Sequence, residues 1–226
     1  MNGNFQWPPL ESDPEIFTEY SRKIGSSDLL TFGELFSLDY KEIQVIESPV
    51  YAVIVSYEES KEPNLRKENI KPTNYVTFYM KQTEVLDNAC GIIALLHSIG
   101  NNLGNANLQE NSILFNYYER NKKKSSDERA KDLENYEEFK NVHNEYASMG
   151  QSAHCQEQSD VKNHYVTFIF YQGNLVELDG LLDGPYVVKE NIQENDLLDE
   201  TVLEMKRRLE EGLVTENLSI MFLTKY

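Results

Sequence analysis

Three side chains in this chain are of the types that carry out nucleophilic chemistry together: Cys90, His164 and Asp179. A thiol becomes a strong nucleophile when it loses its proton. A histidine can take that proton if a third group orients its ring. The sequence therefore raises the hypothesis of cysteine catalysis, provided that the fold brings the three residues together.

The first element that must position this chemistry is the segment around Cys90. Asn88 is a good N-cap, which predicts that Cys90 lies in the first turn of a helix. Residues 92–99 are apolar on nearly every face, which favours a buried helix, and Gly100-Asn101-Asn102 would end it. The positive end of such a helix favours the thiolate. The alternative is a small cysteine that only packs at the start of a core helix.

The chain has four histidines, and their positions in the sequence indicate which of them could act as the base. His97 follows Cys90 by two helical turns, which is about 10 Å along the axis, so we expect it to serve packing. His143 near the end of a charged helix and His154 in a polar loop are expected to be structural or exposed. His164 differs because it begins an apolar strand, which would hold it rigidly at the edge of the core.

A hairpin could bring His164 and Asp179 together. Residues 164–171 and 175–179 are predicted strands that flank Gln172-Gly173-Asn174, a hairpin signal. With a two-residue turn, Asp179 lies diagonally across from His164 on the same face, at a Cβ separation of about 7–8 Å or less. A register shift by one residue would place Asp179 on the opposite face. The pattern thus permits a His–Asp pair without fixing it.

Composition narrows the classes of protein. The 226 residues are 40% hydrophobic, which is enough for one domain with a sizeable core, and we expect a single domain over residues 1–226. A net charge of −17 argues against a nucleic-acid binder. Two cysteines do not make a disulfide framework, and no signal peptide or membrane-length apolar run is visible. The default expectation is a soluble protein of the cytoplasm or the nucleus, with no membrane partner.

The remaining elements follow from periodicity and capping. Asp13 as N-cap and Pro14 predict a helix that ends at Gly25, and Ser125 begins a capping box for another helix that runs to about Tyr146. Residues 58–73 and 150–163 read as loops. Further strands and helices are predicted at residues 49–57, 75–80, 196–211 and 218–223, and residues 103–118 are expected to be partly helical.

Several motifs, in order and at similar spacing over nearly the whole chain, resemble the ubiquitin C-terminal hydrolases of the short, single-domain type. They are Trp7 to Pro14, Asn88-Ala89-Cys90-Gly91 with its apolar helix, Glu128-Arg129-Ala130 with Leu133 to Tyr136, Gly150-Gln151, and His164 with Glu177 to Gly180. The resemblance implies a papain-like cysteine protease fold of the α/β (α+β) class. A central, mostly antiparallel sheet would be flanked by helices, and the chain path would be knotted.

The resemblance also implies roles for individual residues. Cys90 would be the nucleophile, His164 the general base and then the acid, and Asp179 the group that orients His164. Gln82 would donate an amide hydrogen bond to the oxyanion beside the backbone N–H of Cys90, and Asn88 would help to place that region.

The partner implied by the resemblance is ubiquitin. Four further residues fall where the family contacts it, with the acidic ones receiving its basic tail: Leu10, Glu11, Glu15 and Glu34. An ordinary solvated face is the alternative for the acidic residues. No metal or cofactor is implied, no nucleic acid is expected to bind, and we expect a monomer.

The spacing around Gln82 departs from the family. The family places its glutamine six residues before the cysteine, whereas Gln82 lies eight before Cys90 and Glu84 occupies the usual position. Either two residues are inserted and Gln82 still reaches the site, or the oxyanion hole is altered. We favour the insertion because Met80-Lys81-Gln82-Thr83 keeps the flanking residues of the family.

The predicted activity is hydrolysis after the C-terminal glycine of ubiquitin through a thioester. Residues 150–163, which include Cys155, would cross the active-site groove and restrict substrates to small adducts or flexible peptides. Two alternatives remain open. One is a ubiquitin-binding module of the same fold with weak or no turnover, and the other is a hydrolase for a ubiquitin-like modifier such as Nedd8.

Overall fold

The computed structural model describes residues 5–39, 43, 45–46, 49–59, 70–150 and 163–225. Within them the chain forms a six-stranded sheet in the order β1-β6-β2-β3-β4-β5, with every neighbouring pair antiparallel. The prediction of a central antiparallel sheet is therefore confirmed. Its strands are β1 (Leu30–Leu35), β2 (Val50–Glu59), β3 (Asn163–Tyr171), β4 (Asn174–Leu178), β5 (Tyr186–Glu190) and β6 (Val214–Lys225).

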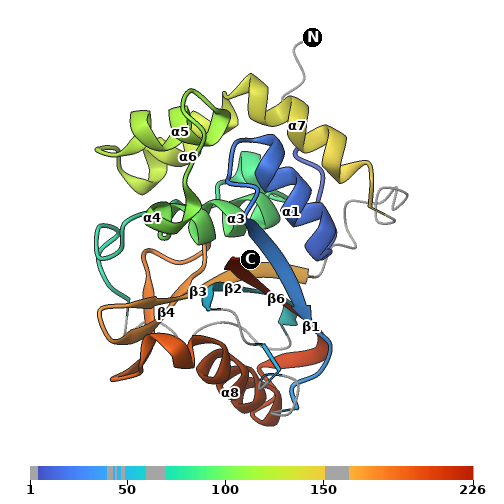
Figure 1. Ribbon diagram of the computed structural model, residues 1–226, viewed down its shortest axis with the longest axis vertical. Helices are drawn as coiled ribbons and strands as arrows, with labels where there is room; N and C mark the ends of the chain where they lie inside the picture. Colours follow the sequence, from blue (N-terminus) through green and yellow to red (C-terminus); the bar gives the residue numbers. More distant parts are fainter. Residues whose placement is uncertain are drawn as a thin grey trace.

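Helices cover both faces of this sheet (Figure 1). All but α8 lie on one side, and α8 lies alone on the other. The helices are α1 (Pro14–Lys23), α3 (Cys90–Gly100), α4 (Leu103–Ala106), α5 (Ile113–Asn121), α6 (Ser126–Glu134), α7 (Glu137–Ala147) and α8 (Leu197–Glu210). Two short 3-10 helices, η2 (Glu84–Leu86) and η5 (Glu194–Asp196), complete the elements.

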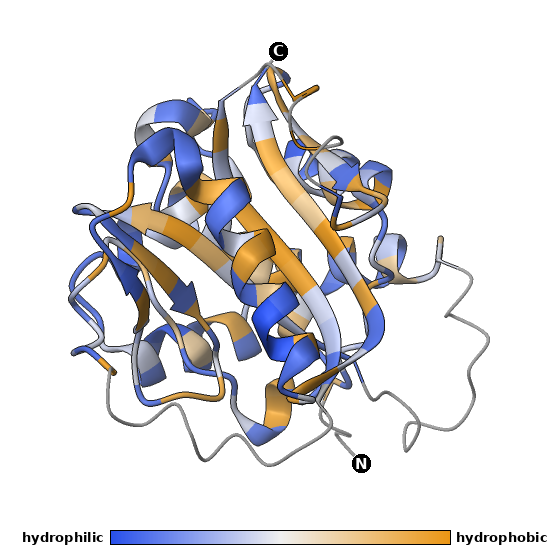
Figure 2. Cartoon of the chain, turned by 90° about the horizontal axis from the view of Figure 1, so that it is seen from below, coloured by the Kyte–Doolittle hydropathy of each residue, from blue (hydrophilic) through white to orange (hydrophobic). Residues whose placement is uncertain are grey.

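The sheet is covered on both faces because its central strands are apolar on both sides. In β2, Ala52 and Ile54 join the core shared with α1 and α3, whereas Val53 and Val55 join the core under α8. This alternation follows from the two-residue period of a strand. Figure 2 shows the result, since the strands are largely hydrophobic while α8, in front of them, alternates between hydrophilic and hydrophobic residues. The rigid central strands then support α3, which packs against β2 and β3.

The predicted register of the His164 hairpin is confirmed. Thr167 pairs with Leu178 and Phe168 with Glu177, which is the pairing expected for a two-residue turn. That turn has positive φ angles at Gln172 and Gly173, as a type I′ turn requires.

The prediction of a strand at residues 75–80 is wrong. This segment is not part of the sheet, because its backbone groups pair with side chains. Asn101, the C-cap of α3, accepts from the Phe78 N–H at 3.0 Å and donates to the Phe78 carbonyl at 2.8 Å. Arg129 of α6 donates to the Tyr79 carbonyl at 2.8 Å. An apolar pattern predicts that a segment is buried, but it does not predict whether its backbone bonds to another strand or to side chains.

Several further elements and boundaries differ from the predictions. The helix expected from Ser125 to about Tyr146 begins with the predicted capping box but breaks into α6 and α7 at Asn135. The Asn135 side chain donates to the Lys131 carbonyl at 2.6 Å, and such local bonds compete with helix continuation. Strands β1 and β5 were not predicted, and residues 58–59, expected in a loop, extend β2. Strand β6 begins at Val214, four residues before the strand predicted at residues 218–223.

Other predictions lie wholly or partly outside the described residues. These are most of the two predicted loops, with His154 and Cys155 in the second. The knotted chain path remains a prediction of the resemblance. Among the described helices, none combines the length and hydrophobicity needed to cross a bilayer.

A buried ion pair ties α8 to the strand that leads to Asp179. Arg208 donates to both carboxylate oxygens of Glu177 at 3.2 and 2.6 Å, and its Nε donates to Glu204 at 2.7 Å. The Arg208 and Glu177 side chains are only 2% and 0% exposed. The interior of the fold therefore holds a buried carboxylate whose charge the Arg208 guanidinium balances.

We predict that Arg208→Met lowers the free energy of unfolding by about 3–5 kcal/mol, because it removes the guanidinium that balances the charge of the buried Glu177 carboxylate. Urea denaturation followed by circular dichroism measures the loss. Arg207→Met is the matched control, since Arg207 also bonds Glu204 but is half exposed, and should cost about 1 kcal/mol or less. Equal losses in the two variants would contradict the role given to the Arg208–Glu177 pair.

Candidate active site

Cys90 lies at the first position of α3, as predicted, but Asn88 does not cap the helix. The N-cap is Ala89, and no side chain caps this end. Ala89 takes the N-cap position because the chain enters α3 through a tight turn, in which the Ala89 N–H donates to the Leu86 carbonyl. Cys90 is 6% exposed and sits where the first N–H groups of a helix have no partner within it.

His164 and Asp179 are in direct contact. His164 begins β3, Asp179 follows the last residue of β4, and the His164 Nε2 donates to Asp179 Oδ1 at 2.7 Å. The Leu181 N–H donates to the same oxygen at 2.9 Å and fixes the carboxylate. The side chains are 13% and 4% exposed, so water competes little for this bond.

His164 also bonds the Cys90 side chain. Because Nε2 is occupied by Asp179, Nδ1 is the ring nitrogen left for the thiol. Burial alone would lower the pKa of His164, but the charge of Asp179, their hydrogen bond and the contact with Cys90 outweigh it and raise that pKa to about 10. The ring is therefore an imidazolium at neutral pH, and a positive charge beside a cysteine sulfur favours the thiolate nucleophile.

The loop that carries Asp179 is held by the segment before Gln82. The Tyr79 hydroxyl lies 2.8 Å from the Asp179 carbonyl and 2.7 Å from the Leu182 carbonyl. The Gln82 N–H donates to the Gly180 carbonyl at 2.8 Å. Gln82 and Asp179 are thus fixed relative to each other through backbone contacts. Gly180 also faces α3, because a Cβ added there would lie 3.5 Å from Ile93.

The Gln82 amide is oriented by the residues between it and Cys90. Its Nε2 donates to the Asp87 carbonyl at 2.6 Å, and that carbonyl follows η2 directly. An amide nitrogen carries two hydrogens, so one remains available for another acceptor. Glu84, at the usual family position of the glutamine, is exposed on η2. The longer spacing falls in the stretch that contains η2, and the carbonyl that follows η2 holds the Gln82 amide.

The residues expected to contact substrate lie on the segment that leads into α1, on α1 itself and on β1. Leu10 is buried, and a Cβ added to Gly91 would lie 3.1 Å from its Cβ, so its side chain packs on the start of α3. Glu11 faces Gly150, the last described residue before the predicted crossing loop. Glu15 is exposed in the first turn of α1, and Glu34 on β1 accepts from Ser219 at 3.5 Å.

Two other histidines are structural, in agreement with the sequence. His97 contacts the Met80 backbone and stacks on Tyr79, with ring centroids 5.3 Å apart. His143 donates to the Pro8 carbonyl at 2.7 Å. Burial lowers the pKa of each to about 4, so both are neutral at neutral pH. The structure therefore brings only His164 of the three described histidines to Cys90.

Across the described part of the chain, no three His, Cys, Asp or Glu side chains are grouped so that they could hold a metal ion.

A family model matches most of the chain. Residues 7–210 match the model described as ubiquitin carboxyl-terminal hydrolase, family 1. The chain belongs to this family. It is thus a hydrolase of the cysteine peptidase type, as the resemblance of its motifs implies.

Individual relatives agree over most of their length. A probable ubiquitin carboxyl-terminal hydrolase of Dictyostelium discoideum is 29% identical over 97% of this chain and 88% of its own. Ubiquitin carboxyl-terminal hydrolase 3 of Arabidopsis thaliana is 30% identical over 80% of this chain and 78% of its own.

A solved structure shares the fold. The UCH37 catalytic domain of Trichinella spiralis, crystallised with ubiquitin vinyl methyl ester, superposes with a TM-score of 0.76 at 24% identity. The comparison covers 98% of this chain and 96% of that one. The papain-like α/β fold predicted from the sequence is confirmed.

Sequence reasoning missed the residues that fix the backbone around Gln82 and Asp179. Tyr79 and Asn101 were assigned to a strand and to a helix end, yet both hold the segment that carries Gln82. The available signal was a pair of polar groups, a hydroxyl and an amide, within otherwise apolar stretches that are expected to be buried.

We predict that Asp179→Asn lowers the pKa of His164 from about 10 toward the ordinary value of 6.5, because it removes the negative charge that stabilises the imidazolium. Titration of the imidazole signals by NMR measures the shift. An unchanged pKa in Asp179→Asn would contradict the assigned partner.

The same pair predicts how stability depends on pH. The pKa of His164 is higher in the folded chain than in the unfolded chain, so its contribution is fully present below about pH 6.5 and declines as the pH rises toward 10. The loss of folding stability that comes from His164 between pH 6.5 and 10 should be absent in Asp179→Asn.

Proposed function

We propose that the chain is a deubiquitinating enzyme that cleaves small adducts or flexible peptides from the C-terminal glycine of ubiquitin. The observation that carries this proposal is the hydrogen-bonded series Cys90–His164–Asp179 at the first turn of α3. It has the nucleophile, base and orienting group that acyl transfer to a thiol needs. Family membership supports ubiquitin as the substrate.

The reaction divides into two steps. The Cys90 sulfur, having given its proton to His164, attacks the glycine carbonyl carbon, and the C–N bond breaks as His164 returns the proton to the leaving amine. The product is a thioester between Cys90 and ubiquitin. A water molecule, deprotonated by His164, then attacks the thioester carbonyl, and the Cys90 sulfur leaves. Asp179 stabilises the imidazolium in both steps.

Two donors are proposed for the oxyanion that forms during each attack. One is the backbone N–H of Cys90 at the first helical position, and the other is the second hydrogen of the Gln82 amide. The Asp87 carbonyl fixes this amide before substrate arrives, and preorganised donors are the effective ones. This arrangement supports the inserted-loop alternative over a lost oxyanion hole.

The substrate side is proposed to lie along α1 and β1. Glu11, Glu15 and Glu34 come from neighbouring elements, and Glu34 is linked through Ser219 to Ser12 at the start of α1. Carboxylates on this face suit a basic peptide tail, and the net charge of −17 strengthens long-range attraction of such a tail. We assign this surface to the ubiquitin tail.

Turnover of ubiquitin that carries a C-terminal fluorophore tests the proposal. Wild type is expected to release the fluorophore, and Cys90→Ala to release none because no other group can form the thioester. Gln82→Ala should reduce kcat by about 10²–10³, the usual cost of one oxyanion donor. Gln109→Ala is the matched control, since Gln109 is exposed and its described hydrogen bonds use the backbone.

The possible contrary results point to different errors. A wild type as silent as Cys90→Ala, but still able to bind ubiquitin, would make the chain a binding module. An undiminished rate in Gln82→Ala would show that the oxyanion donor is misassigned. Faster release of the fluorophore from Nedd8 than from ubiquitin would identify the ubiquitin-like modifier as the preferred substrate.

A further inference from the structure

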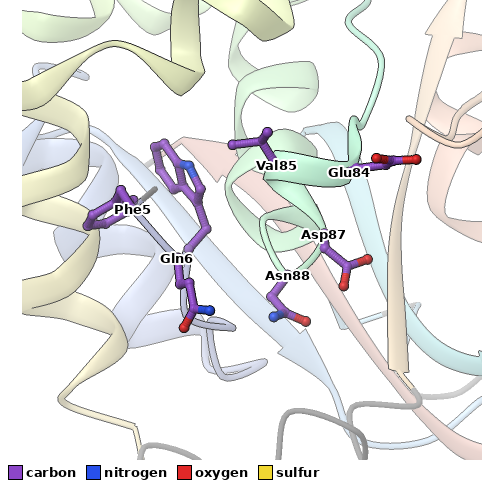
Figure 3. A pocket seen from close by; sticks show the side chains of 7 residues that line it. Phe5, Gln6, Glu84, Val85, Asp87 and Asn88 are labelled. Atoms are coloured by element: carbon purple, nitrogen blue, oxygen red, sulfur yellow. The ribbon is translucent and has the colours of Figure 1, made fainter. Parts of the chain in front are cut away.

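A hollow of about 340 Å³ lies beside the active site, between the N-terminal segment and η2. Figure 3 shows Phe5 on one side of it and Glu84, Val85, Asp87 and Asn88 on the other. One wall is therefore built from the residues between Gln82 and Cys90, where the spacing of this chain departs from that of the family.

Both walls lead to the start of α3. Asn88 lies two residues before Cys90 in the chain. On the other wall, the N-terminal segment continues from Trp7 to Leu10, which packs on Gly91. The ubiquitin tail is assigned above to the surface of α1 and β1. The hollow, lined by η2 and the segment before Leu10, is thus available to the group on the other side of the scissile bond.

The lining combines aromatic rings with free carboxylates. Phe5 and Trp7 meet edge to face, with ring centroids 5.2 Å apart. Glu84 and Asp87 are exposed, and neither carboxylate has an ion-pair partner among the described residues. The Lys140 ammonium already lies over the Phe5 ring, 5.6 Å from its centroid, so the two exposed carboxylates are the groups that attract a cationic side chain. Its aliphatic stem can then lie along the apolar part of the lining.

A further polar group favours a peptide over a simple amine. The indole N–H of Trp7 is buried and has no hydrogen-bond acceptor in the described part of the chain. A buried donor without an acceptor is costly, and a peptide carbonyl is an acceptor that a ligand could supply. A peptide offers this carbonyl and the basic side chain together.

We propose that this hollow is a subsite for the leaving group and that it selects peptides with a lysine or arginine among their first residues. The proposal rests on the function proposed above. It adds a preference on the side of the substrate that departs, which ubiquitin itself does not determine.

Ubiquitin fusions that differ only in a short C-terminal extension test this preference. Each fusion carries an extension of glycine and serine with a single lysine at one of its first four positions, and kcat/KM is compared with that of the lysine-free extension. At one position or more, wild type should cleave the lysine fusion about tenfold faster. Glu84→Gln/Asp87→Asn should bring this ratio close to one.

A control separates the hollow from the general negative charge. Glu110→Gln/Glu138→Gln removes the same charge from exposed residues that do not line the hollow, and should keep the tenfold ratio. Equal rates for all extensions in wild type would overturn the proposal, as would a ratio that persists in Glu84→Gln/Asp87→Asn. If that variant slows every fusion equally, the carboxylates act on ubiquitin and the subsite is refuted.

The design also separates failure of the inference from failure of the function. Cleavage of the lysine-free fusion by wild type establishes hydrolase activity independently of the hollow. Absence of cleavage in every fusion would refute the proposed function, whereas cleavage without any lysine preference would refute only the subsite.

Discussion

The site depends on a segment whose backbone is satisfied by side chains instead of a neighbouring strand. The backbone of residues 78–80 is held by His97 of α3, by Asn101 at the C-cap of that helix and by Arg129 of α6. Because buried backbone groups must find partners, this segment has few other paths to follow. It delivers Gln82 to the loop of Asp179 and so aligns two parts of the site that are far apart in the sequence.

A second constraint is electrostatic. The chain carries a net charge of −17, yet the site concentrates a positive charge on His164, where a buried carboxylate and the thiol stabilise it. Burial alone would remove that charge, so the pKa of His164 stays high only because of its partners. The sheet fixes them, since the β3–β4 turn sets the register and the Glu177–Arg208 pair anchors β4 to α8.

Local sequence signals predicted the elements that carry the nucleophile and the base. The capping of α1, the extent of α3 and the turn at Gln172-Gly173 each depend on a few neighbouring residues, and all three were predictable. The strand proposed at residues 75–80 was wrong because its partners are side chains distant in sequence. Strand β5 was missed because polar residues follow Val187 and Val188 and shorten the apolar run. Asn88 was taken as an N-cap from its residue type, but the turn before α3 places Ala89 there.

The most direct measurement is mass spectrometry of the chain after incubation with ubiquitin that carries a vinyl methyl ester at its C-terminus. This electrophile reports both the nucleophile and the partner in one covalent product. The account predicts one ubiquitin per chain, attached at Cys90, with Cys155 unmodified as an internal control. Attachment at Cys155, or no attachment to the intact chain, would contradict it.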